Sequence, residues 1–216
     1  MNKTPEKVVF KSQVLGREVH LDVFEFGKPE SNLLLFGGTG IDEEEYQLRG
    51  ESVIPLFDCV KDHDLQHVRI AYATAPYDVP FARFDEFPNE ISKWNRHVTE
   101  EIFERWKSGS FVVSSFSGSV SLILNGIESG KRCLGAAVLA PDGLKPDFSS
   151  PKHWRDSLVV FTSPNDRVCS HPENRMAIQT LVESGEAREV EVAARSHTLF
   201  EYVRQTPFLD WIGSRA

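Results

Sequence analysis

Three residue types that together catalyse acyl transfer occur at Ser117, Asp166 and His197. A serine hydroxyl is a weak nucleophile at neutral pH, because it must lose its proton as it attacks a carbonyl carbon. A neutral imidazole can accept that proton, and a carboxylate beside the imidazole fixes its tautomer and stabilises its charged form. If the fold brings them together, these side chains would form a nucleophile, a general base and the acid that orients the base.

Ser117 stands at the corner between a predicted strand and a predicted helix. The apolar run 111–116 leads directly to it, and helical spacing follows over 120–127. A serine at such a corner is held in a tight, strained turn that projects its hydroxyl over the sheet. A serine-rich segment after a strand can also be an ordinary turn, so the pattern gains weight only from a matching acid and base.

Asp166 and His197 follow two later strands. Asp166 lies in the segment TSPNDRV after the run 158–161, where it is either the acid or one turn-forming residue in a Pro-Asn-Asp cluster. His197 follows the run 188–194 and precedes a final helix that we expect to end near Trp211. Because ligands of parallel sheets collect at the carboxyl ends of the strands, we expect the three side chains to meet there.

Alternating and continuous apolar patterns predict the sheet itself. VVFKSQV and VHLDVFEF alternate apolar and polar positions around the turn LGRE, which is typical of an antiparallel hairpin. Later runs are continuously apolar, as in parallel strands buried on both faces, and helical spacing lies between them. We expect one α/β domain over residues 1–216, with about eight strands in a mostly parallel sheet, an N-terminal antiparallel hairpin and helices on both faces. The continuous runs are LLLFGG, HVRIAYATA, FVVSSFS, LGAAVLA, LVVFTS and EVEVAA, and the helical positions are Ile91, Trp94, Val98, Ile102, Trp106, Met176 and Leu181.

The order Ser, Asp, His, each after its own strand, resembles the α/β-hydrolase superfamily over nearly the whole chain. The family's G-x-S-x-G turn corresponds to S-F-S-G-S, so Ser115 and Ser119 stand where the family has glycine. The resemblance implies that Ser117 is the nucleophile, Asp166 the acid and His197 the base. Some family members carry the acid on the preceding strand, which makes Asp142 the alternative.

The resemblance also implies an oxyanion hole. Phe36-Gly37-Gly38-Thr39-Gly40 follows the third predicted strand, like the family's H-G-G loop, with Phe36 in place of the histidine. The backbone N–H groups of Gly38 and Gly118 would bind the oxygen that becomes negatively charged. Thr39 could add a hydroxyl to the substrate site, or it is simply a turn residue.

A substrate pocket is expected next to this hole. Only Pro141–Asp156 separates two strands where many members of the family carry a helical cap, so no large cap domain is expected and the site should be open. The aromatic-rich loop 75–88 would line an apolar acyl or alcohol pocket, or pack into a cluster of its own. We expect hydrolysis of a small-molecule ester or thioester, free or carrier-bound, through an acyl-enzyme. The pocket candidates are Tyr77, Phe81, Phe84 and Phe87.

Composition limits the possible partners and compartments. The net charge of −8 over 216 residues disfavours nucleic acid or an anionic membrane as a partner. No apolar run approaches the roughly 20 residues that cross a bilayer, and the N-terminal residues lack the apolar core of a secretory signal. Three widely spaced cysteines predict neither disulfides nor zinc, and the acidic residues and histidines of 62–67 are typical of a solvated helix end. We therefore expect a cytoplasmic protein with no metal and no cofactor.

Two other function classes stay open. The segment GGTGIDEEEY begins like a dinucleotide-binding turn, but Glu43 stands where the third glycine belongs. The acidic residues 42–45 would also repel a pyrophosphate at the helix N-terminus. The other class is a hydrolase-like protein that binds a ligand without turnover, because Ser115, Ser119 and Phe36 depart from the family pattern.

Overall fold

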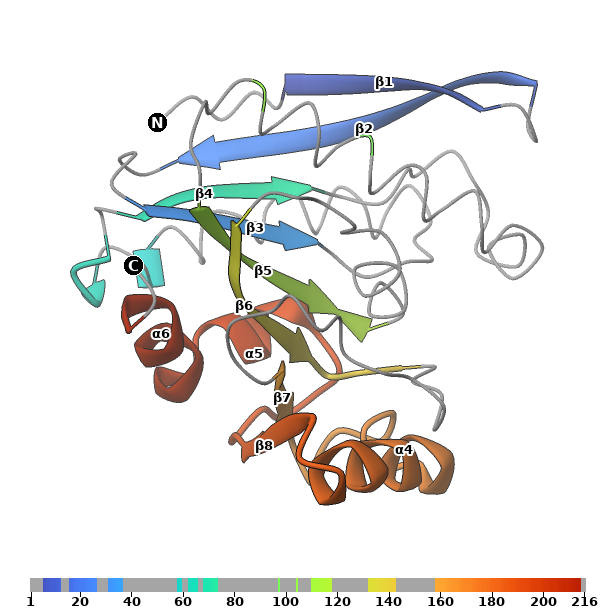
Figure 1. Ribbon diagram of the computed structural model, residues 1–216, viewed down its shortest axis with the longest axis vertical. Coiled ribbons are helices and arrows are strands. Elements are labelled where there is room, and N and C mark those ends of the chain that lie inside the picture. The colour runs from blue at the N-terminus through green and yellow to red at the C-terminus, as the bar shows by residue number, and fades with distance from the viewer. Residues whose placement is uncertain are drawn as a thin grey trace.

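One twisted sheet organises the molecule (Figure 1). The computed structural model describes residues 6–12, 16–26, 31–36, 58–59, 62–65, 68–73, 97, 104, 110–117, 132–142 and 158–214. Within these residues the strand order is β1-β2-β4-β3-β5-β6-β7-β8. The strands are β1 (Glu6–Ser12), β2 (Arg17–Phe26), β3 (Ser31–Phe36), β4 (Val68–Ala73), β5 (Ser110–Phe116), β6 (Arg132–Leu139), β7 (Leu158–Thr162) and β8 (Ala187–Glu191), and the helices are α4 (Pro172–Glu183), α5 (Leu199–Val203) and α6 (Thr206–Gly213).

The N-terminal hairpin lies at one edge of this sheet. β1 pairs antiparallel with β2, in a register that sets Glu6 opposite Val23 and Ser12 opposite Arg17. Gly16, in the turn, has φ +66°, a left-handed conformation that glycine adopts without a steric penalty. The hairpin predicted from the alternating pattern is therefore confirmed.

The other six strands are parallel to one another. β4, β3, β5, β6, β7 and β8 follow one another in the sheet with parallel pairing throughout. All five residues of β7 are buried, as expected for a parallel strand covered on both faces. The continuous apolar runs of the sequence correspond to these strands.

The strand beside β4 distinguishes this sheet from a dinucleotide-binding fold. In that fold a third parallel strand continues the sheet beyond the second strand. Here β2 occupies that position and runs antiparallel to β4. The N-terminal hairpin thus takes the place that a parallel strand holds in a dinucleotide-binding domain.

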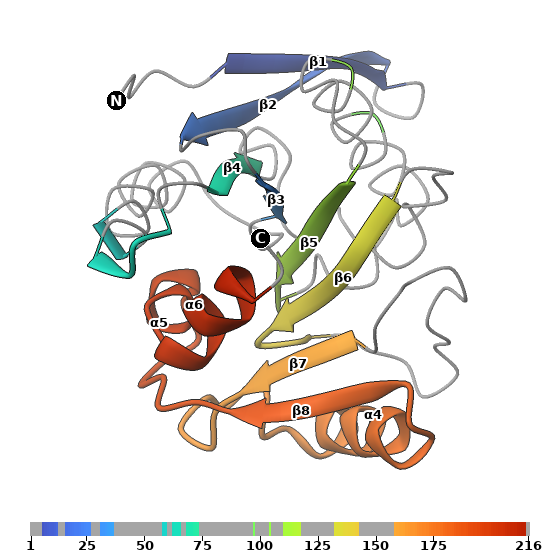
Figure 2. The same ribbon diagram turned by 60° about the vertical axis from the view of Figure 1, so that its left-hand side comes forward.

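The described helices cover both faces of the sheet. Val159 and Phe161 of β7 belong to one buried cluster with the apolar residues of α5 and α6. Successive side chains of a strand point to opposite faces, so Leu158 and Val160 face the other way. On that side α4 packs against β8 and buries its own apolar residues. Figures 1 and 2 show α4 on one side of the β5–β8 end of the sheet and the α5–α6 pair on the other.

The C-terminal segment forms two helices where one was expected. α5 ends at Val203 and α6 begins at Thr206, with Pro207 in its first turn. A proline inside a continuous helix would lack its N–H and would clash with the carbonyl four residues earlier, here Val203. The strand predicted over 188–194 is also shorter, since β8 ends at Glu191. Residues 192–198 therefore form a loop between β8 and α5.

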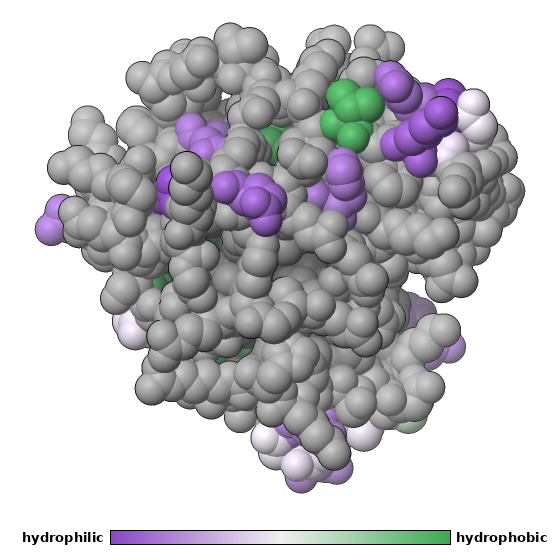
Figure 3. Space-filling view, turned by 45° about the horizontal axis from the view of Figure 1, so that its top comes forward, coloured by the Kyte–Doolittle hydropathy of each residue, from purple (hydrophilic) through white to green (hydrophobic). Residues whose placement is uncertain are grey.

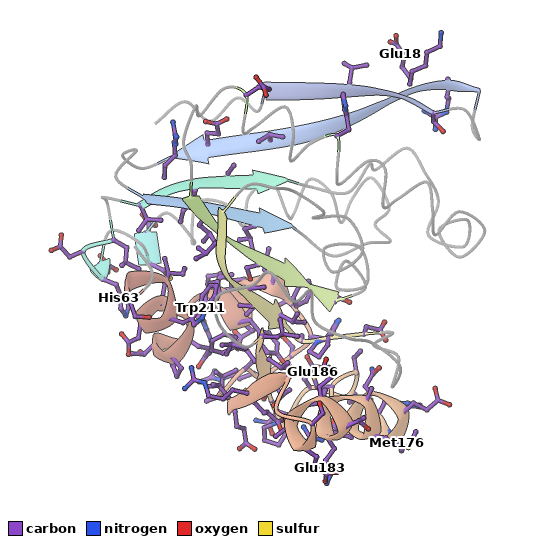
Figure 4. All side chains as sticks on the ribbon, viewed as in Figure 1. Glu18, His63, Met176, Glu183, Glu186 and Trp211 are labelled. Atoms are coloured by element: carbon purple, nitrogen blue, oxygen red, sulfur yellow. The ribbon has the colours of Figure 1, made fainter. Side chains whose placement is uncertain are left out.

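The space-filling view (Figure 3) shows the surface character of one face of the molecule. Figure 3 shows mostly hydrophilic described residues on one face, with apolar surface in small separate areas. In Figure 4, Met176 and Glu183 lie on the outer side of α4, whereas Trp211 lies where α6 meets the sheet. No helix among the described residues combines the length and apolar character needed to cross a bilayer.

Phe208 of α6 is expected to be a major stabilising residue of the core. Its ring is fully buried and packs edge-on against Phe161 at 5.6 Å, while Trp211 stacks on it at 6.1 Å. Phe208→Ala should lower the free energy of unfolding by about 3–5 kcal/mol, measured by urea denaturation, because it leaves a cavity between α6 and β7. The control Met176→Ala removes a side chain that is 57% exposed and should change it by less than about 0.5 kcal/mol. Equal losses in the two variants would contradict this assignment of the core.

Candidate active site

Ser117 directly follows β5 and has a strained backbone. Its φ is +53°, in the left-handed region that non-glycine residues rarely enter and that costs about 1–3 kcal/mol when it is enforced. The residue before it, Phe116, still belongs to β5 and is buried. The backbone therefore departs from the extended conformation of β5 at Ser117, which agrees with the corner position predicted from the sequence.

The hydroxyl of Ser117 points at His197. Its Oγ lies 2.9 Å from Nε2 of the imidazole. The other ring nitrogen, Nδ1, lies 2.8 Å from Oδ2 and 3.0 Å from Oδ1 of Asp166. An ionised carboxylate can only accept hydrogen bonds, so Nδ1–H donates to Asp166. This leaves Nε2 unprotonated in the neutral ring and able to accept the proton of the Ser117 hydroxyl.

Asp166 is fully buried and ionised. Burial alone would raise the pKa of its carboxyl group, but hydrogen bonds from His197 and Tyr202, the nearby imidazole and the backbone N–H of Val168 together lower this pKa to about 2. The hydroxyl of Tyr202 donates to Oδ2 at 2.7 Å, and the N–H of Val168 donates to Oδ1 at 2.9 Å. A buried carboxylate is tolerated only when its lone pairs are satisfied in this way.

A hydrogen bond connects the loop that carries Asp166 with the loop that carries His197. Ser163, in the loop after β7, is buried and donates its hydroxyl to the backbone carbonyl of Ala194 at 2.7 Å. Ala194 lies three residues before His197, in the loop after β8. The hydrogen bond therefore fixes the separation of the two loops that meet at the Asp166–His197 contact.

A helix cap fixes the other end of the His197 loop. Thr198 is the N-cap of α5, and its hydroxyl oxygen accepts from the backbone N–H of Glu201 at 3.4 Å. The carboxylate of Glu201 reaches back to accept from the N–H of Arg195 at 2.9 Å, and it also pairs with Arg204 at 2.6 Å. This variant of the capping box holds the backbone on both sides of His197.

Phe116 packs against the imidazole of His197. The ring centroids are 5.0 Å apart with the planes tilted by 36°. The same Phe116 ring lies 6.1 Å from that of Tyr202. Because Phe116 directly precedes Ser117, the strand that carries the hydroxyl also limits how far the imidazole can rotate.

The structure separates the two candidate acids. Asp142 follows β6 and is exposed, and its Oδ1 accepts from the side-chain amide of Asn174 at 3.4 Å. Asp166, in contrast, makes the hydrogen bonds to His197. Three of the predicted site residues are thus brought together: Ser117, Asp166 and His197.

The remaining predicted site residues lie outside the described part of the chain. The predicted oxyanion donors and pocket residues are in segments for which the structure gives no placement. Ser115, the first of the two serines in place of glycine, lies within β5 and pairs with Phe36 of β3 and Val138 of β6. The undescribed residues are Gly38, Gly118, Thr39, Tyr77, Phe81, Phe84, Phe87 and Ser119.

Sequence reasoning missed the residues that support the site. Thr198 and Glu201 have the T-x-x-E spacing of a capping box directly before an apolar segment, so that pattern could have located the cap. Ser163 lies in the same turn-forming segment as Asp166, TSPNDRV. Tyr202 gives no such signal, because its hydroxyl contacts a carboxylate 36 residues earlier in the chain.

Comparisons with known proteins bear on the fold. No family model and no curated protein matches the chain. Among solved structures, the Bacillus cereus carboxylesterase is similar, with a TM-score of 0.61 and 17% identity over 96% of this chain and 98% of that one. Esterase PE8 has a TM-score of 0.63 and 14% identity, over 90% of this chain and 96% of that one.

A third solved structure lacks a lid. XC6422 from Xanthomonas campestris, described as an a/b serine hydrolase without lid, has a TM-score of 0.58 and 13% identity over 99% of this chain and 93% of that one. At such low identity these likenesses speak for architecture alone. They show that the chain has the α/β-hydrolase fold, as the resemblance in the sequence implied.

The buried carboxylate should make folding stability depend on pH. The pKa of Asp166 is about 2 in the folded chain against an ordinary 3.8, so the ionised form stabilises the fold above the ordinary value and this contribution is lost as pH falls through about 2. It amounts to about 2 kcal/mol. Urea unfolding of the wild type and Asp166→Asn should therefore show a stability difference that shrinks by this amount between about pH 6 and about pH 2. A difference that stays constant over this range would show that Asp166 is not held ionised by its partners.

Proposed function

Starting from the α/β-hydrolase fold of this chain, we propose that the protein is a serine hydrolase that cleaves a carboxylic ester or thioester through an acyl-enzyme on Ser117. The observation that carries the proposal is the 2.9 Å contact between the Ser117 hydroxyl and Nε2 of His197. Nε2 is the acceptor there because the proton of the neutral ring sits on Nδ1, which donates a hydrogen bond to the buried Asp166 carboxylate.

Acylation follows from this arrangement. Oγ of Ser117 attacks the carbonyl carbon of the substrate while its proton passes to Nε2 of His197. Asp166 stabilises the imidazolium that forms, since its carboxylate lies 2.8 Å from Nδ1. The tetrahedral intermediate then breaks its bond to the leaving oxygen or sulfur, which receives the proton from Nε2, and the acyl group stays on Ser117.

Deacylation uses the same groups with water as the nucleophile. His197 accepts a proton from the water as the water oxygen attacks the acyl carbon, and then returns the proton to Oγ of Ser117. The products are a carboxylic acid and the free hydroxyl. His197 is 25% exposed at its side chain, which allows water to reach Nε2 in this step.

The oxyanion and substrate sites complete the proposal. The backbone N–H groups of Gly38 and Gly118 would bind the negative oxygen of the tetrahedral intermediate, each contributing about 3–4 kcal/mol to the transition state. The aromatic loop 75–88 would hold the acyl or alcohol group. The residues of this loop that would contact the substrate are Tyr77, Phe81 and Phe84, and Thr39 of the glycine loop would add a hydroxyl.

Ester and thioester substrates use the same groups. The similar solved structures include proteins described as an esterase and a carboxylesterase, which supports an oxygen ester. A thioester stays in the proposal because the same serine, histidine and oxyanion donors cleave both bonds. The competing class, a binding protein without turnover, predicts saturable occupancy by a reactive ester with no product release.

A fluorophosphonate probe tests the nucleophile directly. The probe should form a covalent adduct on Ser117, located by mass spectrometry of peptides, because the activated hydroxyl attacks phosphorus as it would attack a carbonyl carbon. Ser117→Ala should remove the adduct, and His197→Ala should slow labelling by at least about a hundredfold. A well-folded wild type that gains no adduct on Ser117 would exclude the proposed chemistry.

Turnover of a panel of nitrophenyl esters and acyl-CoA thioesters tests whether Asp166 is the carboxylate that orients His197. Asp166→Asn should lower kcat by about ten-thousandfold, because the imidazole then takes the wrong tautomer. The matched control Asp142→Asn changes the other aspartate considered for this role, which bonds to Asn174 instead, and should leave kcat within about twofold. If Asp142→Asn were the damaging variant, the acid would have been assigned to the wrong loop.

A further inference from the structure

A buried phenol shares the Asp166 carboxylate with His197. The hydroxyl of Tyr202 lies 2.7 Å from Oδ2 of Asp166, the same oxygen that lies 2.8 Å from Nδ1 of His197. Tyr202 is fully buried. It belongs to α5 and stands five residues after His197, so one short segment supplies both side chains that contact this oxygen.

The direction of each hydrogen bond in this cluster can be assigned. The carboxylate of Asp166 is ionised and accepts only, so Tyr202 must donate its single hydroxyl proton to it. The thiol of Cys169 lies 3.4 Å from the same hydroxyl oxygen, and therefore it must be the donor in that contact. The result is an ordered series in which Cys169 donates to Tyr202, Tyr202 donates to Asp166, and Asp166 also accepts from His197.

The acid strengths of these groups agree with that order. Burial, together with the nearby charge of Asp166, raises the pKa of the Cys169 thiol to about 12, although the hydrogen bond with Tyr202 lowers this pKa. Burial also raises the pKa of the Tyr202 hydroxyl, and the neighbouring Cys169 and Asp166 add to the effect. Both groups keep their protons at neutral pH, and the negative charge of the cluster stays on Asp166.

Packing prevents the phenol from turning away. Its ring lies 6.1 Å from that of Phe116, and the Phe116 ring also contacts the imidazole of His197. Among the residues that the structure describes, the titratable groups that face the Asp166 carboxylate are His197 from the loop after β8, Tyr202 from α5 and Cys169 from its own loop. Tyr202 is thus fixed between the ring beside the nucleophile and the carboxylate behind the base.

We propose that Tyr202 is a positioning residue for the catalytic base, acting through Asp166. Its hydroxyl holds the carboxylate in the orientation that accepts Nδ1–H of His197 and takes up part of the carboxylate's negative charge. The proposal rests on the proposed hydrolase function for its effect on rate. The arrangement of the hydrogen bonds can be tested without any turnover.

The hydroxyl of Tyr202 has two effects in this role, one on the orientation of the carboxylate and one on its charge. A well-oriented carboxylate keeps Nε2 directed at Ser117, which favours proton transfer. A carboxylate that shares its charge with a phenol attracts the protonated imidazole less strongly than a carboxylate without that donor. Loss of the hydroxyl should therefore slow the reaction and also move its pH dependence, whereas loss of a purely structural hydroxyl would lower stability alone.

Tyr202→Phe tests the role, with Thr162→Val as the matched control. Thr162 is also a buried hydroxyl that donates to a carboxylate, that of Glu189 at 2.6 Å, and Glu189 keeps its ion pair with Arg175 when the hydroxyl is removed. Tyr202→Phe should lower kcat about tenfold, the amount that one hydrogen bond to a charged group supports. KM should stay within about twofold, because the buried phenol touches no substrate.

The pH profile separates positioning from stability. In Tyr202→Phe the acid limb of kcat/KM should move to higher pH, because the carboxylate that has lost a donor favours the protonated imidazole. Thr162→Val should lower the melting temperature by a similar amount while it leaves kcat and the acid limb at wild-type values. A Tyr202→Phe variant that loses only stability, like the control, would overturn the proposal and leave the hydrolase function intact.

NMR titration of the His197 ring makes the test independent of activity. The imidazole should protonate at a higher pH in Tyr202→Phe than in the wild type and in Thr162→Val, and its Nδ1–H resonance should shift. An unchanged ring in Tyr202→Phe would overturn the positioning role. If the ring responds as expected while no variant, wild type included, shows turnover or a Ser117 adduct, the hydrogen-bond order stands and the proposed hydrolase function fails.

Discussion

The site depends on one interaction, the hydrogen bond from Nδ1 of His197 to the buried carboxylate of Asp166. A carboxylate removed from water is costly unless donors surround it, and here the donors come from its own loop, from the loop after β8 and from α5. This bond fixes which ring nitrogen carries the proton, and it therefore decides that the other nitrogen can accept from Ser117. A stability requirement and a chemical requirement are met by the same contact.

The sheet makes this contact possible by ending three strands at the same edge. β5, β7 and β8 belong to the parallel part of the sheet, and in Figure 2 the arrowheads of β5 to β8 point to the same side. Strands alone do not set side chains to within a few tenths of an ångström. The Ser163–Ala194 bond and the Thr198–Glu201 cap supply that precision, because they hold the backbone on both sides of His197.

Much of this arrangement could be predicted from the sequence, because it depends on patterns of neighbouring residues. The hairpin follows from alternation, the buried strands from continuous apolar runs, and Ser117, Asp166 and His197 from their places just after such runs. The choice between Asp166 and Asp142 could not be made locally, since it depends on how two adjacent strands are aligned in space. The contact of Tyr202 with Asp166 could not be predicted for the same reason, whereas the helix break at Pro207 has a local signal in the proline itself.

The left-handed backbone at Ser117 has a consequence for how such a protein can change over time. Replacing Ser117 by glycine would stabilise the fold, because glycine adopts φ +53° without strain. Glycine, however, has no hydroxyl. Selection for a sturdier fold and selection for reactivity therefore pull in opposite directions at this single position. Replacement of Ser117 by glycine would relax this turn and would also remove the hydroxyl on which the proposed chemistry depends.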